Sequence, residues 1–305
     1  MKYFQYLLIG LFIIAASRKT LAQDNDDARA LVKQGVKLND EKKYAEAIEK
    51  YQQALKLDTG NLYANYQLAY SLFLSDKGKD GIPYLEKVVK GDGKLNAAAY
   101  DLLGLIHFKS KQYTEAEKNA IEAIKLDPKH AGTQRMYALV SFHQNKRAQA
   151  LLGFCSFILL EPNTARSTEA FANIQHILQG GALKPEPGEL APGAIDANTS
   201  ALNQAITQAV ADFSKRRYAS AADLLAAELT AIFTNVGQLA EKQTGNYFFR
   251  TYLAAYFYRL AQSPNMPAMA RLVSSSTPES TKWIKDNQQP VADLEAWVKG
   301  AERAF

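Results

Sequence analysis

Apolar residues recur every three or four positions through residues 28–164, in runs separated by short polar turns. This spacing places the apolar side chains along one face of a helix and predicts amphipathic helices in place of strands. Two such runs fit between successive breaks in the pattern, and proline marks two of the breaks, at Pro128 and Pro162. The pattern therefore predicts a series of helical hairpins, because proline stops the second helix of a pair.

The hairpins repeat with a step of about 34 residues. Residues 44–48 read YAEAI, residues 113–117 read YTEAE and residues 147–151 read RAQAL. Small residues that let neighbouring helices approach closely keep the same step, at Gly35, Ala69, Gly104 and Ala138. We place the repeats at 28–61, 62–96, 97–130 and 131–164. Because one hairpin cannot cover its own apolar face, several must stack to form a continuous core.

The third of these units resembles the tetratricopeptide repeat. The positions that carry the resemblance are Tyr100, Leu103, Gly104, Ala116, Ala123 and Pro128. The unit at 62–96 departs most from the family, because Gly81 stands in place of the helix-contact alanine. The resemblance implies an all-α fold, with a right-handed superhelical array of helix-turn-helix repeats (an α-solenoid) over residues 28–179. Residues 165–179 would form a capping helix at the end of the array.

Arrays of this family bind peptides or proteins on a concave face lined by the first helix of each repeat, so the resemblance implies a partner-binding surface there. The positions that it places on this face are Tyr63, Tyr66, Tyr70, Phe73, Asp101, Phe108, Arg135, Leu139 and Phe142. The first four are three or four residues apart and form one helical stripe. Tyrosine offers a large rigid surface with a hydrogen-bonding tip, which suits binding. The alternative is that the stripe packs against an adjacent helix or under the C-terminal half.

The second half of the chain follows a cluster of glycine and proline at residues 180–197, which predicts a linker. We expect a helical C-terminal domain over 198–305. Its start resembles a diverged hairpin, since residues 217–221 read RYASA and echo KYAEA at 43–47, although Glu228 falls where Ala54 would be. Chance similarity stays an alternative there. Residues 247–258 are apolar on most sides, which predicts the buried centre of the domain or else a pocket built from tyrosines.

The N-terminus carries an apolar run from Tyr6 to Ala16, with a basic start before it and small residues after it. This pattern predicts a secretory signal peptide over residues 1–22. The run is shorter than the roughly 20 residues that cross a bilayer, although a membrane anchor is the alternative. We therefore expect an exported protein, periplasmic or envelope-associated or else secreted, with no stable membrane insertion after cleavage.

The net charge and the residue types of the chain exclude several classes of function. Removing residues 1–22 takes away Lys2, Arg18 and Lys19, so the formal charge of +5 falls by three to +2, which gives no electrostatic case for nucleic acid. Cys155 is the only cysteine, so no intramolecular disulfide can form, and its apolar neighbours predict a buried side chain. No catalytic motif occurs and the four histidines lie on separate predicted elements, so we expect no catalytic, cofactor or metal site.

Two functions from different classes stay open. The first is a non-enzymatic scaffold of the bacterial cell envelope that binds a partner protein or peptide through the array. The second is an enzyme or small-ligand binder with its site in residues 198–305. A purely structural oligomer is a third interpretation.

Overall fold

The computed structural model describes residues 23–91, 93–181 and 195–305. Every regular element within these ranges is a helix, so the prediction of an all-α array of helical repeats is confirmed. None of the helices described is both long and apolar enough to cross a membrane. The signal peptide expected at 1–22, and residues 182–194 of the expected linker, lie outside the described residues. The chain forms two compact units, unit 1 up to Ser110 and unit 2 from Lys111.

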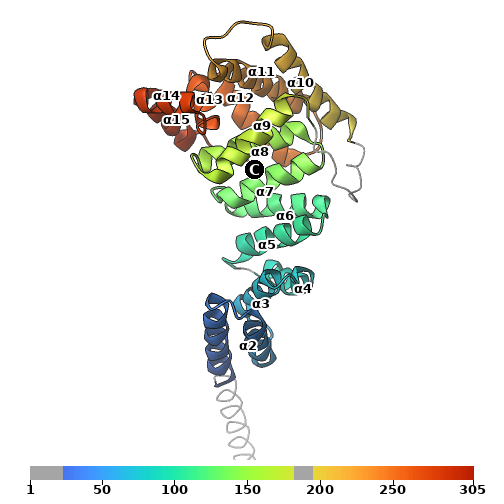
Figure 1. Cartoon of the computed structure of the whole chain (residues 1–305). Coiled ribbons are helices and arrows are strands. Elements are labelled where there is room, and N and C mark those ends of the chain that lie inside the picture. The colour runs from blue at the N-terminus through green and yellow to red at the C-terminus, as the bar shows by residue number, and fades with distance from the viewer. Residues whose placement is uncertain (1–22, 92, 182–194) are drawn as a thin grey trace, which may run out of the picture. The chain divides into compact units, whose positions relative to one another are not determined.

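Unit 1 consists of stacked helical hairpins (Figure 1). Its helices are residues 23–40, α2 (Tyr44–Leu57), α3 (Leu62–Leu74), α4 (Gly78–Lys90) and α5 (Asn96–Lys109). Gly35 permits the closest approach, because a Cβ there would lie 2.6 Å from the ring of the fully buried Tyr51. Asn39 joins neighbouring hairpins, since its side chain donates to the Tyr51 hydroxyl (3.3 Å) and accepts from Ser71 Oγ (2.9 Å). Three of the small residues of the repeat, Gly35, Ala69 and Ala138, thus lie at helix contacts.

The turn inside each hairpin repeats in the backbone as well as in the sequence. One residue per turn adopts a left-handed conformation, with φ of 59°, 59°, 59° and 56° at Lys42, Asp76, Lys111 and Asn145. In three of these turns the next amide donates back across the helix end, as from Lys43 to the Leu38 carbonyl (2.8 Å). This geometry satisfies carbonyls that the ended helix leaves unpaired.

Unit 2 is built around one enclosed helix, α8 (Arg147–Leu160), on which all residues from Ala148 to Ile158 are buried. Helices α7, α9, α10 and α13 and the π-helical segment η1 contact it. The elements of the unit are α6 (Tyr113–Leu126), α7 (Ala131–His143), α8, α9 (Ala165–Leu178), α10 (Ala197–Phe213), α11 (Ala221–Lys242), η1 (Phe249–Ala254), α12 (Ala255–Ala261), α13 (Met266–Val273), α14 (Pro278–Asp286) and α15 (Gln288–Gly300). Cys155 lies on α8 and is fully buried, as predicted, and burial raises the pKa of its thiol.

The division between the units differs from the boundary expected at 180–197. It falls between α5 and α6, and helices from both sides of the expected linker share unit 2. The cause is the apolar surface of α8, which α10, η1 and α13 cover. Asn203 of α10 also fixes the start of α8, because its side chain accepts from the Arg147 amide (2.9 Å) and donates to the Asn145 carbonyl (2.8 Å).

Candidate functional site

The first helix of the second hairpin carries what we call the α3 aromatic stripe, made of Tyr63, Tyr66, Tyr70 and Phe73. Tyr63 is 43% exposed and Tyr70 38%, whereas Tyr66 and Phe73 are half-buried. The rings of Tyr66 and Tyr70 stack with their planes 3° apart and their centroids 6.4 Å apart. The inner edge of the stripe is therefore held by packing, and its outer edge faces solvent.

The neighbouring helix α5 contacts α3 and contributes polar groups beside the stripe. Burial, and next to it the nearby Tyr70 and the Asp101 carboxylate, raise the pKa of Tyr66, so Asp101 lies within electrostatic reach of the stripe. The Lys109 ammonium lies 4.6 Å above the Phe73 ring and 3.7 Å from Asp76. Phe108 is half-buried on the same helix. Unit 1 thus gathers six of the expected site residues on two adjacent helices.

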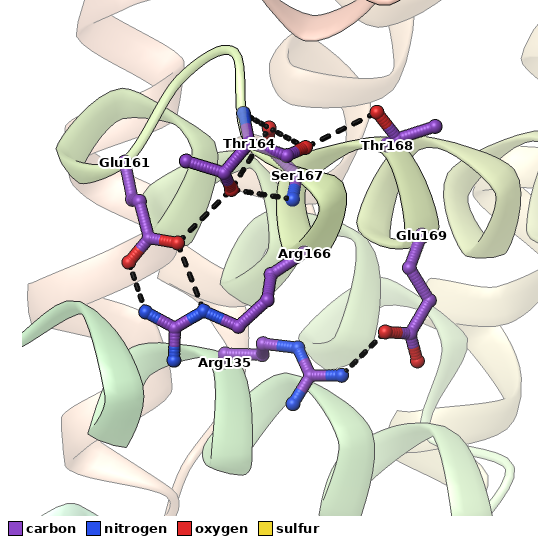
Figure 2. Close-up of polar contacts among 7 residues, drawn as sticks. All are labelled: Arg135, Glu161, Thr164, Arg166, Ser167, Thr168 and Glu169. Atoms are coloured by element: carbon purple, nitrogen blue, oxygen red, sulfur yellow. Dashed lines mark hydrogen bonds and ion pairs between the residues drawn. The ribbon is translucent and has the colours of Figure 1, made fainter.

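The remaining expected residues lie on α7 in unit 2, where Arg135 and Phe142 contact other helices of the same unit. Arg135 donates to Glu169 of α9 at 2.6 Å, and Figure 2 shows its guanidinium turned toward that carboxylate. Phe142 is only 1% exposed and packs edge-on against Phe154 and His176, with ring centroids 6.2 and 5.9 Å away. The structure therefore places Phe142 in the core and not on a partner-facing surface, because α9 covers this part of α7.

The start of α9 explains why that helix is firmly placed. Thr164 and Ser167 form a capping box, in which the Thr164 hydroxyl accepts from the Ser167 amide (3.1 Å) and the Ser167 hydroxyl accepts from the Thr164 amide (2.7 Å). Arg166 pairs with Glu161 through two nitrogens in the same turn (Figure 2). These bonds satisfy amides that a helix start leaves open.

The aromatic segment expected as the centre of the C-terminal helices is buried, with Tyr252, Tyr256 and Phe257 each at most 1% exposed. Residues 301–305 cross it in a non-helical conformation. The Arg303 guanidinium lies 3.9 Å above the Tyr256 ring and 4.9 Å above the Tyr252 ring, and it donates to Ser156 Oγ at 2.6 Å. Phe305 stacks on Tyr252 with centroids 4.7 Å apart. The tyrosine cluster is thus filled by a side chain of the same chain.

A cavity of about 470 Å³ lies within unit 2, between α9, α10, α11 and the loop into α14, and we call it the α11 cavity. Its walls are mostly apolar, and its charged lining residues are Glu228 and Glu279. Glu228 is 7% exposed and has no hydrogen bond or ion pair within the described residues. Burial alone raises the pKa of its carboxyl group.

Glu228→Gln is expected to raise the Tm at neutral pH and to leave it nearly unchanged at about pH 4. The pKa of Glu228 in the folded state lies above the ordinary value of 4.5. Below that value the carboxyl group is protonated in both the folded and the unfolded protein, so it does not lower the free energy of unfolding. As the pH rises through that value and then through the raised pKa, the unfolded state gains more from ionising and the free energy of unfolding falls. Thermal melts followed by circular dichroism at several pH values check this.

Glu241→Gln is the matched control, because Glu241 lies on the same helix and is exposed. A Tm difference between Glu228→Gln and the unaltered protein that stays constant with pH would contradict a raised pKa at Glu228. An equal pH dependence in both variants would assign the effect to net charge.

Within the ranges that the structure describes, no group of three or more histidine, cysteine, aspartate or glutamate residues is placed to hold a metal ion.

Residues 97–130 match the family model of the tetratricopeptide repeat. These residues form a tetratricopeptide repeat. The match covers the third predicted repeat, which contains helices α5 and α6, and its bounds are those that the sequence pattern predicted. A search of curated proteins finds no match.

Three solved structures are similar to this chain. The "MamA RS-1 ArsTM double mutant" is 25% identical, over 45% of this chain and 76% of its own, with a TM-score of 0.43. YrrB, described as "a TPR protein with an unusual peptide-binding site", is 20% identical over 52% and 79%, with a TM-score of 0.44. Pseudomonas aeruginosa pilF is 17% identical over 79% and 98%, with a TM-score of 0.43. The tetratricopeptide repeat is assigned from the match to residues 97–130.

Sequence reasoning missed two unusual side-chain environments, those of Arg303 and Glu228. Nothing in the pattern singled out Arg303, whose partners come from helices far away in the sequence. Glu228 did carry a signal, since it stands at the position of the fully buried Ala54 in the first repeat. Glu228 lines the α11 cavity.

Proposed function

We propose that this tetratricopeptide-repeat protein is a non-enzymatic interaction scaffold that binds a partner protein or peptide through the α3 aromatic stripe and Asp101. The observation that carries this proposal is the exposure of Tyr63 and Tyr70 beside packed, half-buried Tyr66 and Phe73. Stacked repeats in general form extended binding surfaces, and the repeat match supports a protein-interaction role in general.

The arrangement of the stripe suits recognition of an extended segment. Stacking already fixes the orientation of the Tyr66 and Tyr70 rings, so little side-chain entropy is lost when a partner docks. Their hydroxyl groups and the Asp101 carboxylate offer hydrogen bonds, and Asp101 favours a partner with a basic or amide group. Arg135 and Phe142 are left out of this surface, because one is paired to Glu169 and the other is buried.

Selection from a phage-displayed peptide library on residues 23–305 tests the proposal without a known partner. Selected peptides are then titrated by fluorescence anisotropy against the double variant Tyr63→Ala, Tyr70→Ala. We expect the variant to bind at least about tenfold more weakly, because aromatic anchors at an interface each contribute about 1–2 kcal/mol. Both residues are exposed, so the variant keeps the fold.

Leu57→Ala is the matched control, since Leu57 is a comparably exposed apolar side chain of unit 1, at 42%, outside the stripe. Equal peptide affinity for the double variant and for the Leu57→Ala protein would overturn the assignment of the site to α3.

A location in the cell envelope is part of the same proposal and is supported by the pattern of residues 1–22 alone. Fractionation of bacteria that produce the full chain, with mass spectrometry of its N-terminus, tests this part. Recovery in the cytoplasm with Met1 or residues 2–22 retained would overturn it.

A further inference from the structure

We propose that the α11 cavity binds an organic cation, a primary ammonium group on a flexible apolar stem, and that Glu228 pairs with the ammonium. This inference goes beyond the proposed scaffold function, because it concerns a different kind of ligand and a different unit of the protein. It rests on the size, the lining and the charge of the cavity together with the unpartnered burial of Glu228.

The dimensions of the cavity fit a small ligand. Its volume of about 470 Å³ lies within the range of roughly 300–1,000 Å³ that small-molecule sites occupy. Phe171, Leu178, Val210 and Leu225 supply apolar wall from three helices. Such walls favour a ligand with an apolar stem, because transfer of apolar surface out of water is favourable.

The charge of the lining selects a cation over an anion. Glu228 and Glu279 line the cavity, and none of the lysine, arginine or histidine residues that the structure describes does. The basic residue held near α11 by an ion pair is Arg271, which is bonded to Asp223 at 2.6 Å and stacked on Trp283, and it does not line the cavity. An entering ammonium group would therefore meet two carboxylates and no competing positive charge.

The Glu228 carboxylate lines the cavity and is available to a ligand there. The residue is 7% exposed overall, and its carboxyl oxygens are not among the side-chain atoms that are both fully buried and without a hydrogen-bonding partner. Glu228 has no hydrogen-bonding partner in the part of the chain that the structure describes. In the alignment of residues 217–221 with 43–47, Glu228 falls at the position of Ala54, and of Ala123 in the third repeat, which are 0% and 2% exposed.

A probe series with one apolar body and three head groups tests the proposal. Hexylammonium, hexanol and hexanoate are titrated into residues 23–305, and dissociation constants are taken from two-dimensional NMR shifts. We expect hexylammonium to bind most tightly and hexanoate least. Glu228→Gln should weaken hexylammonium binding about tenfold, the loss expected for a hydrogen bond to a charged group, and should leave hexanol binding nearly unchanged.

Glu241→Gln removes the same charge from an exposed position of α11 and should leave all three dissociation constants unchanged. Shifts confined to residues that line the cavity would support the site. Hexylammonium binding that Glu228→Gln does not weaken, or hexanoate binding as tight as that of hexylammonium, would overturn the proposal.

The same chemistry could reach the cavity as a free amine or as a lysine side chain of a protein partner. A short peptide with one internal lysine, titrated in parallel, distinguishes these sources. Peptide binding that depends on Glu228 supports a protein-borne ammonium group, and hexylammonium binding alone supports a free amine. This result is independent of the scaffold proposal, because the Tyr63→Ala, Tyr70→Ala variant should bind hexylammonium normally.

Discussion

Arg303→Ala is expected to lower the free energy of unfolding of unit 2 by about 3 kcal/mol. The guanidinium contacts the rings of Tyr252 and Tyr256 and donates to Ser156, which is fully buried. A desolvated cation–π contact contributes about 2 kcal/mol, and a hydrogen bond from a charged donor about 1.5 kcal/mol before partial solvent exposure reduces both. The Ser156 hydroxyl keeps its own hydrogen bond to Gln134 Oε1 (3.2 Å), so the loss comes from the contacts of the guanidinium.

Urea denaturation followed by tryptophan fluorescence measures this effect, because both tryptophans, Trp283 and Trp297, lie in unit 2. The urea midpoint of Arg303→Lys should lie between those of the unaltered protein and Arg303→Ala, because lysine keeps the positive charge but has no planar group to stack on the tyrosine rings. Glu302→Ala is the control, because that side chain is exposed and only its carbonyl accepts, from Arg259. A midpoint for Arg303→Ala equal to that of Glu302→Ala would show that residues 301–305 do not anchor there.

Gly237→Ala should destabilise unit 2 by about 2 kcal/mol, against the usual preference of a helix for alanine. A Cβ on Gly237 would lie 2.5 Å from Cβ and 2.8 Å from Cγ of Tyr258, which α12 holds against α11. Because the position of a Cβ is set by the backbone, the two helices must separate. Overpacking of this kind costs about 3 kcal/mol and the gain in helix propensity is about 1 kcal/mol, so the clash wins.

Thermal and urea unfolding of Gly237→Ala, followed by tryptophan fluorescence, gives the measurement. Gly300→Ala is the comparison, since a Cβ at Gly300, the last residue of α15, meets no atom within 4 Å. If both variants unfolded at the same midpoint, the close contact between α11 and α12 would be refuted.

The repeats could be predicted from sequence because their determinants are local. Small residues recur at the positions of Gly35 and Ala47 with the step of the hairpin. Each such position indicates a helix contact within the same or the next hairpin. The left-handed turn residues were not predicted, since Lys42, Asp76 and Lys111 lack the usual glycine or asparagine signal. The left-handed conformation of these turns goes with the packing of the two helices that they join, and the identity of the turn residue alone does not predict it.

The parts of the site that sequence could not place depend on contacts between distant segments. Phe142 fits the partner-facing face of a repeat, yet α9 buries it, and nothing in the repeat pattern shows which face the capping helix covers. Arg303 contacts Ser156 across 147 positions of sequence. The boundary expected at 180–197 followed composition, whereas the described units follow which helices cover α8.

The enclosure of α8 has a consequence for how this chain can be shortened or lengthened. In unit 1 the contacts run between neighbouring helices, so hairpins could be inserted or deleted there with one new interface to repair. In unit 2, α8 is contacted by α7, α9, α10, η1 and α13, so truncation after α9 would strip its cover and expose buried side chains such as Leu151 and Phe157. Modularity therefore ends where α8 begins, and unit 2 can be transplanted into another protein only as a whole.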